Sequence, residues 1–229
     1  MGRCGAGDSV RGRGKAILCD LGGVVALFDE ERIFEKLQQV ASVDLREERT
    51  ARLVAETKEL FDRGHLGPRE FYDRLREAIG LNVDYPTFTR VWSDNFWPNH
   101  EVINLLGTLR GRYRLVLLSN TDPLHWDFID RSFAVGRLFD ALVLSYRVGS
   151  IKPERKIFEV ALEVAGVKAQ DALFVDDTER NVLAARELGI HALLYRPGLD
   201  LMREIAKVFA EERDHRLSEG VGDVTPVRK

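Results

Sequence analysis

Polar residues stand at four places in this chain where an apolar run ends or a helix is expected to begin. Asp20 is the first of them, because it follows the apolar run 16–19 and precedes Gly22 and Gly23. Ligands of open α/β sheets bind outside the carboxyl ends of the strands, and glycines there let a ligand approach the backbone. The other three places are Ser119-Asn120, Lys152-Pro153 and Asp176-Asp177.

These side chains have the chemistry that phosphoryl transfer requires. Asp20 offers a carboxylate that could attack phosphorus and form an aspartyl-phosphate intermediate, which water then hydrolyses. Ser119 and the backbone at Asn120 could donate hydrogen bonds to phosphate oxygens. Lys152 could supply positive charge to the phosphate and keep the Asp20 carboxylate ionised. Each residue alone has an ordinary structural explanation, but together they predict an aspartate nucleophile beside a phosphate site.

Asp176 and Asp177 predict a metal site. They follow the apolar run 172–175, and two adjacent carboxylates repel each other unless a cation is nearby. Asp177 could instead only cap the following helix, but this alternative leaves the repulsion without compensation. With Asp20 from another strand, the pair forms an oxygen-ligand site suited to Mg²⁺.

Short apolar runs alternate with helical patterns from residue 98 onward. Four of these runs show no in–out alternation, which is typical of parallel strands covered on both faces: 114–119, 141–145, 172–175 and 191–195. Asp122 and Thr178 are expected to cap helices, and Gly189 to end one. The order predicts a Rossmann-like, doubly wound α/β core with a parallel sheet.

The segment 28–97 interrupts this alternation, because it shows helical spacing and no strand. It leaves the core after the first strand and returns before the helix that precedes the second strand. We therefore expect an α-helical lid over the carboxyl ends of the strands, which would exclude water and select the substrate. Four aromatic residues are expected to pack the core of this lid: Phe88, Trp92, Phe96 and Trp97.

The two ends of the chain have too little apolar content to offset the entropy of ordering. Residues 1–15 are rich in glycine and arginine, and residues 211–229 contain mostly charged residues and glycine. We expect flexible arms at both ends. The α/β core then comprises residues 16–27 and 98–210.

Composition excludes several classes of protein. The net charge of −3 produces no electrostatic potential that would attract nucleic acid or an anionic membrane. No apolar stretch reaches the roughly 18 to 20 residues of a membrane span, and the first 15 residues lack the apolar segment of a secretory signal. We therefore expect a cytoplasmic protein that binds neither nucleic acid nor membranes.

The motifs of several other kinds of site are absent from the sequence. The two cysteines and five scattered histidines form no disulfide or zinc-site pattern, and there is no Gly-x-Ser-x-Gly elbow of a serine hydrolase.

The order Asp20, Ser119, Lys152 and Asp176-Asp177 resembles the four motifs of the haloacid dehalogenase superfamily, and the resemblance covers residues 16–196. The helical insert is similar to the small α-helical cap of that superfamily. In detail the chain resembles a bacterial branch of phosphatases that includes sugar-phosphate phosphatases such as the α-D-glucose-1-phosphate phosphatases. The similarity rests on four sequence segments: DLGGVV, LLSNT, IKPERKIFEVAL and FVDDTERNVLAARELGI.

The resemblance implies a role for each matched residue and Mg²⁺ as the cofactor. The catalytic residues would be Asp20, as nucleophile, and Lys152. The metal would be held by Asp20, the Gly22 carbonyl and Asp176, with support from Asp177. The phosphoryl group would be held by Ser119, Asn120 and Lys152.

Gly22 departs from the pattern, because most phosphatases of the superfamily carry a second aspartate at this position. That aspartate protonates the leaving alcohol and then activates water, and such help is typically worth about 10²- to 10⁴-fold in rate. We expect slower turnover or a preference for good leaving groups, unless a lid residue or a bound water supplies the proton.

The leading hypothesis is a Mg²⁺-dependent phosphomonoester hydrolase, monomeric or homodimeric, acting on a small phosphorylated metabolite, a class that includes sugar phosphates. One alternative is a carbon–halogen hydrolase of the same fold, which needs no metal and leaves the Asp176-Asp177 pair unexplained. Another is a catalytically weak module that binds a phosphorylated ligand or a protein partner, which only Gly22 favours.

Overall fold

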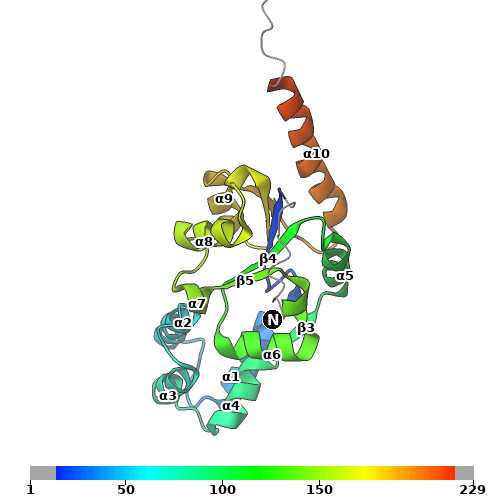
Figure 1. The fold of residues 1–229 in the computed structure, drawn as a ribbon. Coiled ribbons are helices and arrows are strands. Elements are labelled where there is room, and N and C mark those ends of the chain that lie inside the picture. The colour runs from blue at the N-terminus through cyan, green and yellow to red at the C-terminus, as the bar shows by residue number, and fades with distance from the viewer. Residues whose placement is uncertain (1–13, 220–229) are drawn as a thin grey trace, which may run out of the picture.

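A five-stranded parallel sheet forms the centre of the molecule (Figure 1). The computed structural model describes residues 14–219 and, within the last helix, the side chains as far as residue 210. The strands are β1 (Ala16–Cys19), β4 (Arg114–Ser119), β5 (Ala141–Leu144), β6 (Ala172–Asp176) and β7 (His191–Leu194). Their spatial order is β5-β4-β1-β6-β7, so the predicted Rossmann-like α/β class is confirmed.

Helices cover both faces of the sheet, which explains why its strands are apolar without alternation. One layer contains α5 (His100–Leu109), α6 (Pro123–Phe133) and α10 (Leu201–Glu219), and the other contains α8 (Arg155–Ala165) and α9 (Glu179–Glu187) (Figure 1). Successive residues of a strand enter separate buried clusters, as Ile17 packs in the first layer and Leu18 in the second. A short helix, α7 (Ser145–Val148), and two 3₁₀ turns, Val135–Leu138 and Ala169–Asp171, complete the core.

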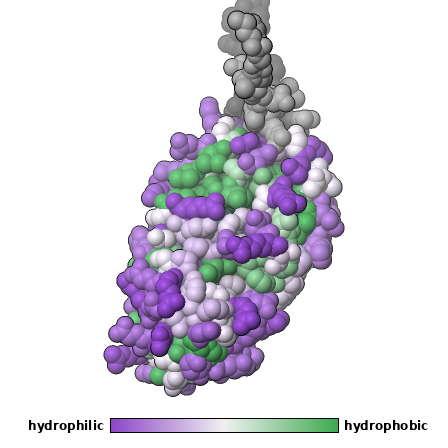
Figure 2. Space-filling model, turned by 60° about the horizontal axis from the view of Figure 1, so that its bottom comes forward, coloured by the Kyte–Doolittle hydropathy of each residue, from purple (hydrophilic) through white to green (hydrophobic). Residues whose placement is uncertain are grey.

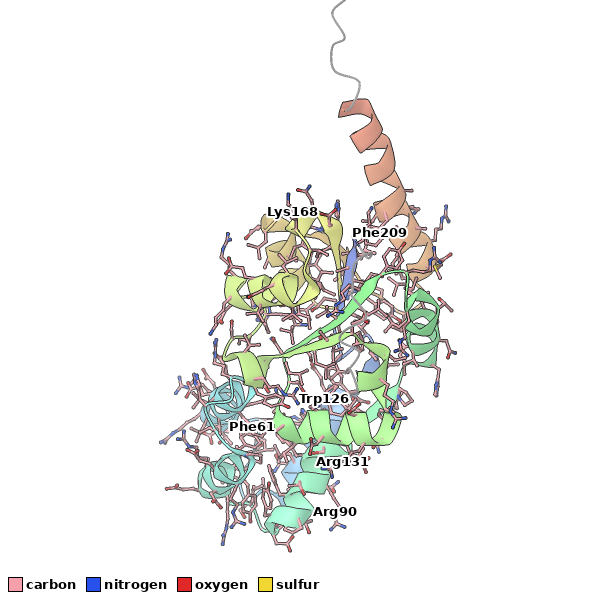
Figure 3. The ribbon with its side chains drawn as sticks, viewed as in Figure 1. Phe61, Arg90, Trp126, Arg131, Lys168 and Phe209 are labelled. Carbon is pink, nitrogen blue, oxygen red and sulfur yellow. The ribbon has the colours of Figure 1, made fainter. Side chains whose placement is uncertain are left out.

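The predicted helical insert forms a second unit, which we call the cap. It contains α1 (Glu30–Val40), α2 (Glu48–Asp62), α3 (Pro68–Ile79) and α4 (Tyr85–Ser93). These helices lie together at one end of the molecule and share their own buried cluster, which includes Phe61, Phe71 and Phe88 (Figures 1 and 3). The rings of Phe61 and Phe71 stack with centroids 4.2 Å apart. The aromatic prediction is confirmed for Phe88 and Trp92, which are both buried there.

The prediction of no strand between residues 28 and 97 is wrong at both ends of that segment. Strands β2 (Ala26–Phe28) and β3 (Phe96–Pro98) pair antiparallel where the chain enters and leaves the cap. The rings of Phe28 and Phe96 lie 5.8 Å apart, so these aromatic residues pack across this connection rather than in the cap core. Trp97 lies in β3 and is partly exposed. Strands of three residues are too short to display a periodicity.

Of the two residues predicted to cap helices, only one makes a capping hydrogen bond with its side chain. Asp122 caps α6 as expected, because its carboxylate accepts hydrogen bonds from the backbone N–H groups of Leu124 and His125, both at 2.9 Å. Thr178 occupies the cap position of α9 but makes no side-chain capping bond. Its hydroxyl donates to the carboxylate of Asp177 at 3.3 Å instead.

The predicted loose tail from residue 211 is helical as far as Glu219, because α10 continues through it. Residues 211–219 are rich in good helix formers, which extend a helix already held by Ile205 and Phe209 in the core. Lys15, predicted in the N-terminal arm, donates to the Phe209 carbonyl at 3.2 Å, and its ammonium lies over the Phe209 ring. Residues 1–13 and 220–229 lie outside the described residues.

Polar side chains dominate the surface at the cap end, where apolar residues form separate patches (Figure 2). Within residues 14–219, no helix combines the length and the apolar character needed to cross a bilayer.

Candidate active site

Three neighbouring strands end at the same edge of the sheet and bring the predicted residues together. Asp20 follows β1, Ser119 ends β4 and Asp176 ends β6, and these strands are adjacent in the order β4-β1-β6. A cavity of about 280 Å³ opens above this edge. Six of the seven predicted site residues line it: Asp20, Gly22, Ser119, Asn120, Lys152 and Asp177. The seventh, Asp176, lies buried beside them.

Lys152 connects the two acids at the base of the cavity. Its side chain is 1% exposed, and its ammonium lies 2.7 Å from Asp20 Oδ1 and 2.6 Å from Asp176 Oδ2. Burial alone would lower the pKa of Lys152, but the two carboxylates outweigh it and raise the pKa above its usual value. Lys152 is therefore a fixed positive charge at neutral pH.

Asn120 holds the Lys152 segment in place. Its amide group donates to the Lys152 carbonyl at 2.9 Å, and its Oδ1 accepts from the Lys152 N–H at 2.7 Å. The Asn120 side chain is thus engaged with the backbone of the lysine. The N–H of Thr121, which follows Asn120, donates to Ser145 Oγ at 2.9 Å. Ser119 is buried, and its hydroxyl contacts only the adjacent Asn120 carbonyl, at 3.4 Å, within the described residues.

The pKa values of the two buried carboxyl groups shift in opposite directions. Burial raises the pKa of Asp20 well above its usual value, in spite of Lys152. Burial has the same tendency at Asp176, but Lys152 and the Thr178 N–H, 2.7 Å from Oδ1, hold the pKa of that carboxyl below its usual value. The amide of Asn181, which sequence reasoning missed, donates to both Asp176 oxygens at 3.1 and 3.2 Å. A cation beside Asp20 would favour its ionised form.

The acids fit the predicted Mg²⁺ site. Asp20, Asp176 and Asp177 each offer an oxygen, and these atoms lie within 4.8 Å of one another. Burial and the neighbouring Asp176 raise the pKa of Asp177, a cost that a bound cation would relieve. Gly23 has φ = 72°, and a Cβ there would lie 1.9 Å from Asp177 Oδ2. Glycine is therefore required for this carboxylate to approach the backbone.

The outer wall of the cavity comes from the cap, from strands β2 and β3, and from α6 and α9. Sequence reasoning assigned no site role to these residues, because nothing in one sequence shows which polar or apolar side chains of a helix face a neighbouring unit. They are Phe28, Glu30, Ile33, Lys58, Phe96, His125, Ile129, Arg180 and Asn181.

Asp122 and His125 join the cap to the core beside the cavity. Asp122 accepts from Trp92 Nε1 at 3.1 Å and lies 2.9 Å from His125 Nδ1. The His125 ring stacks on Trp92 with centroids 5.2 Å apart, and its Nε2 lies 3.0 Å from the Trp92 carbonyl. Burial opposes ionisation of Asp122, but His125 and Lys58 outweigh it and lower its pKa to about 2. An ion pair between Arg63 of the cap and Glu154 of the core, at 2.6 Å, is a further contact between the two units.

Comparison with known proteins agrees with this geometry. The family of haloacid dehalogenase-like hydrolases matches residues 15–189. D-Ribitol-5-phosphate phosphatase of Bacteroides thetaiotaomicron is 26% identical, over 85% of this chain and 98% of that protein. The sesquiterpene phosphatase astK of Aspergillus oryzae is 28% identical, over 85% of this chain and 96% of that protein.

Solved structures show the same fold. A haloacid dehalogenase family enzyme of Bacteroides thetaiotaomicron superposes with a TM-score of 0.77 at 30% identity, over 85% of this chain and 99% of that chain. Its complex with magnesium and inorganic phosphate superposes with a TM-score of 0.73, over 81% and 96% of the two chains. This chain therefore belongs to the haloacid dehalogenase-like hydrolases, a family in which its relatives include phosphatases.

Proposed function

We propose that the protein is a Mg²⁺-dependent phosphomonoester hydrolase that acts through an aspartyl-phosphate intermediate on a small phosphorylated metabolite. The observation that carries the proposal is the buried Lys152, which contacts Asp20 and Asp176 at the base of a cavity lined by Ser119. The names of the two phosphatase relatives, and the magnesium and phosphate complex of the related structure, support it.

The residues divide the reaction between them. Asp20 attacks phosphorus, and the P–O bond to the alcohol breaks as the bond to the carboxylate forms. Lys152 and the Ser119 hydroxyl bind the phosphoryl oxygens and stabilise the charge that develops on them. Asp20, Asp176 and the predicted Gly22 carbonyl, with Asp177, would hold Mg²⁺, which supplies further positive charge to the phosphoryl group. Water then attacks the aspartyl phosphate and regenerates Asp20.

The size and lining of the cavity favour a small metabolite. Its volume of about 280 Å³ lies at the lower end of the range for ligand pockets. Charged side chains of both signs, Glu30, Lys58 and Arg180, line the cavity together with the aromatic residues Phe28 and Phe96. Hydroxyl groups can pair with such charges, so we include sugar and polyol phosphates in the proposal. A panel of phosphorylated sugars, polyols and nucleotides tests the choice.

Removal of metal is expected to abolish phosphate release from 4-nitrophenyl phosphate, and added Mg²⁺ is expected to restore it. Lys152 balances only one of the three negative charges that Asp20, Asp176 and Asp177 carry when ionised, and burial disfavours the ionised form of Asp20. The measurement compares chelator-treated protein with and without added Mg²⁺. Chloride release from a chlorinated carboxylic acid is followed in parallel. Full chloride release after chelation, with no phosphate release, would favour the carbon–halogen hydrolase reading instead.

The variant Gly22→Asp is expected to raise kcat/KM for an alkyl phosphate more than kcat/KM for 4-nitrophenyl phosphate, which should change by less than about threefold, because only an alkoxide needs a proton to leave. A Cβ at Gly22 would lie 3.2 Å from Phe28 Cε1, so the ring must move by a few tenths of an ångström. The φ of Gly22 is not positive, so its backbone accepts a side chain. Equal changes on both substrates would show that leaving-group protonation does not limit the rate.

A further inference from the structure

We propose that Lys58, on helix α2 of the cap, donates the proton to the alcohol that leaves the phosphoryl group. This inference rests on the proposed phosphatase function and identifies the residue that acts where Gly22 provides no acid. Lys58 lines the same cavity as Asp20, Ser119 and Lys152. Lys58 lines this cavity from the cap, and Asp20, Ser119 and Lys152 line it from the core, so the leaving group of a phosphate bound by the core residues lies on the side of the cap.

The ammonium of Lys58 has N–H groups that are available to bind a ligand. Among the described residues it donates one hydrogen bond, to Oδ2 of Asp62 one turn further along α2. An ammonium has three N–H groups, so two remain for a ligand in the cavity. The Lys58 side chain is 40% exposed and the Asp62 side chain 13% exposed. Asp62 therefore anchors a lysine side chain that lines the cavity and remains partly exposed.

The other polar groups on the cavity wall are less suited to donate this proton. Arg180 remains protonated in proteins. Both ring nitrogens of His125 already face acceptors, Asp122 Oδ2 at 2.9 Å and the Trp92 carbonyl at 3.0 Å. Glu30 is an exposed carboxylate, which offers only acceptors when it is ionised. Thr178 carries a hydroxyl whose proton is already directed at Asp177. Lys58 is left as the donor with a transferable proton.

The surroundings of Lys58 keep it protonated before the reaction. Burial would lower its pKa, but the charges of Asp62 and Asp122 and the hydrogen bond to Asp62 outweigh this effect and raise it. An alkoxide is a far stronger base than an amine, so proton transfer to it remains favourable. A nitrophenolate, by contrast, leaves without a proton.

The step balances in atoms and charge. The P–O bond to the alcohol breaks as the Asp20 carboxylate bonds phosphorus, and the electron pair of the broken bond remains on the alcohol oxygen. That oxygen takes a proton from Lys58 Nζ, which leaves a neutral amine and a free alcohol. When water hydrolyses the aspartyl phosphate, the proton released restores the Lys58 ammonium. No oxidant or further reactant is needed.

The test is the dependence of log kcat/KM on the pKa of the leaving group, measured with substituted phenyl phosphates and ethyl phosphate in the presence of Mg²⁺. The variant Lys58→Met is expected to lose about 10²-fold on ethyl phosphate and less than about threefold on 4-nitrophenyl phosphate, so its dependence becomes steeper. A purely structural role would lower all rates together and leave the slope unchanged. Lys36→Met, on α1 of the cap and outside the residues that line the cavity, is the matched control and should keep both the slope and the rates.

Two more variants make the test decisive. Lys58→Arg keeps a cation beside Asp62, so it remains informative even if the Met variant does not fold. It should lose as much on ethyl phosphate as Lys58→Met, because a guanidinium does not give up its proton. Full activity of Lys58→Arg, an unchanged slope in Lys58→Met, or a steeper slope in Glu30→Gln instead would overturn the proposal. Absence of Mg²⁺-dependent phosphate release in the unmodified protein would overturn the phosphatase function itself, and this outcome is distinct from an unchanged slope in an active enzyme.

Discussion

Replacing Asp20 by Asn is expected to lower phosphate release by more than about 10⁴-fold, the order of loss when a covalent hydrolase is deprived of its nucleophile. The amide has nearly the same shape as the carboxylate but does not attack phosphorus. Its Oδ1 can still accept from the Leu21 N–H and from Lys152, which lie 2.7 Å from Asp20 Oδ1 in the native site. The fold should therefore be retained, and the loss should be in kcat.

The measurement combines phosphate release with thermal unfolding of the same preparations. The control is Asp73→Asn, which changes an exposed aspartate on α3 and should leave the rate unaltered. With the unmodified protein, an acid quench during turnover should give a species heavier by one phosphoryl group, with the added mass on the peptide that contains Asp20. Retained turnover in Asp20→Asn, after separation from contaminating phosphatases, would rule out the covalent mechanism.

The fold was predictable wherever the physical signal was long and repeated. Strands such as β4 and β6 are apolar at successive positions because helices cover both of their faces, so their residues appear in the sequence as runs without alternation. The short strands β2 and β3 carry no such signal, and their pairing depends on contacts between Phe28 and Phe96 far apart in the chain. The extension of α10 beyond residue 210 depends on helix propensity and an already formed helix rather than on apolar spacing.

The core side of the site was predictable because its residues stand at strand ends. Asp20, Ser119 and Asp176 each terminate an apolar run, and parallel strands bring such ends to one edge. Asn181 carries no such signal, since it binds Asp176 from inside a helix. The sequence gives no signal that Lys58 belongs to the site, for a similar reason. On an amphipathic helix one polar residue resembles another, and only the packing of cap against core shows that Lys58 reaches the cavity.

Replacing Lys152 by Met is expected to lower phosphate release by about 10³-fold, because the site loses a buried cation that binds the phosphoryl group. The same change should destabilise the fold. Lys152 is 1% exposed and contacts both Asp20 and Asp176, and removal of one partner from a buried ion cluster typically costs about 3–5 kcal/mol. Lys156→Met, at an exposed position of α8, is the matched control and should change neither property.

The pH dependence of that stability distinguishes a role of the Lys152 charge from a role of its packing. Without the cation, Asp20 and Asp176 face each other, so at least one of these carboxyl groups has a folded-state pKa further above the unfolded value of about 3.9. Between those two pKa values the folded state binds more protons than the unfolded state, so stability falls as the pH rises through this window. Urea unfolding without added metal should therefore show a stability deficit of Lys152→Met, relative to the unmodified protein, that grows as the pH rises above about 4. A deficit of constant size would mean that the lysine stabilises the site by filling space and that the two acids are kept apart by other groups.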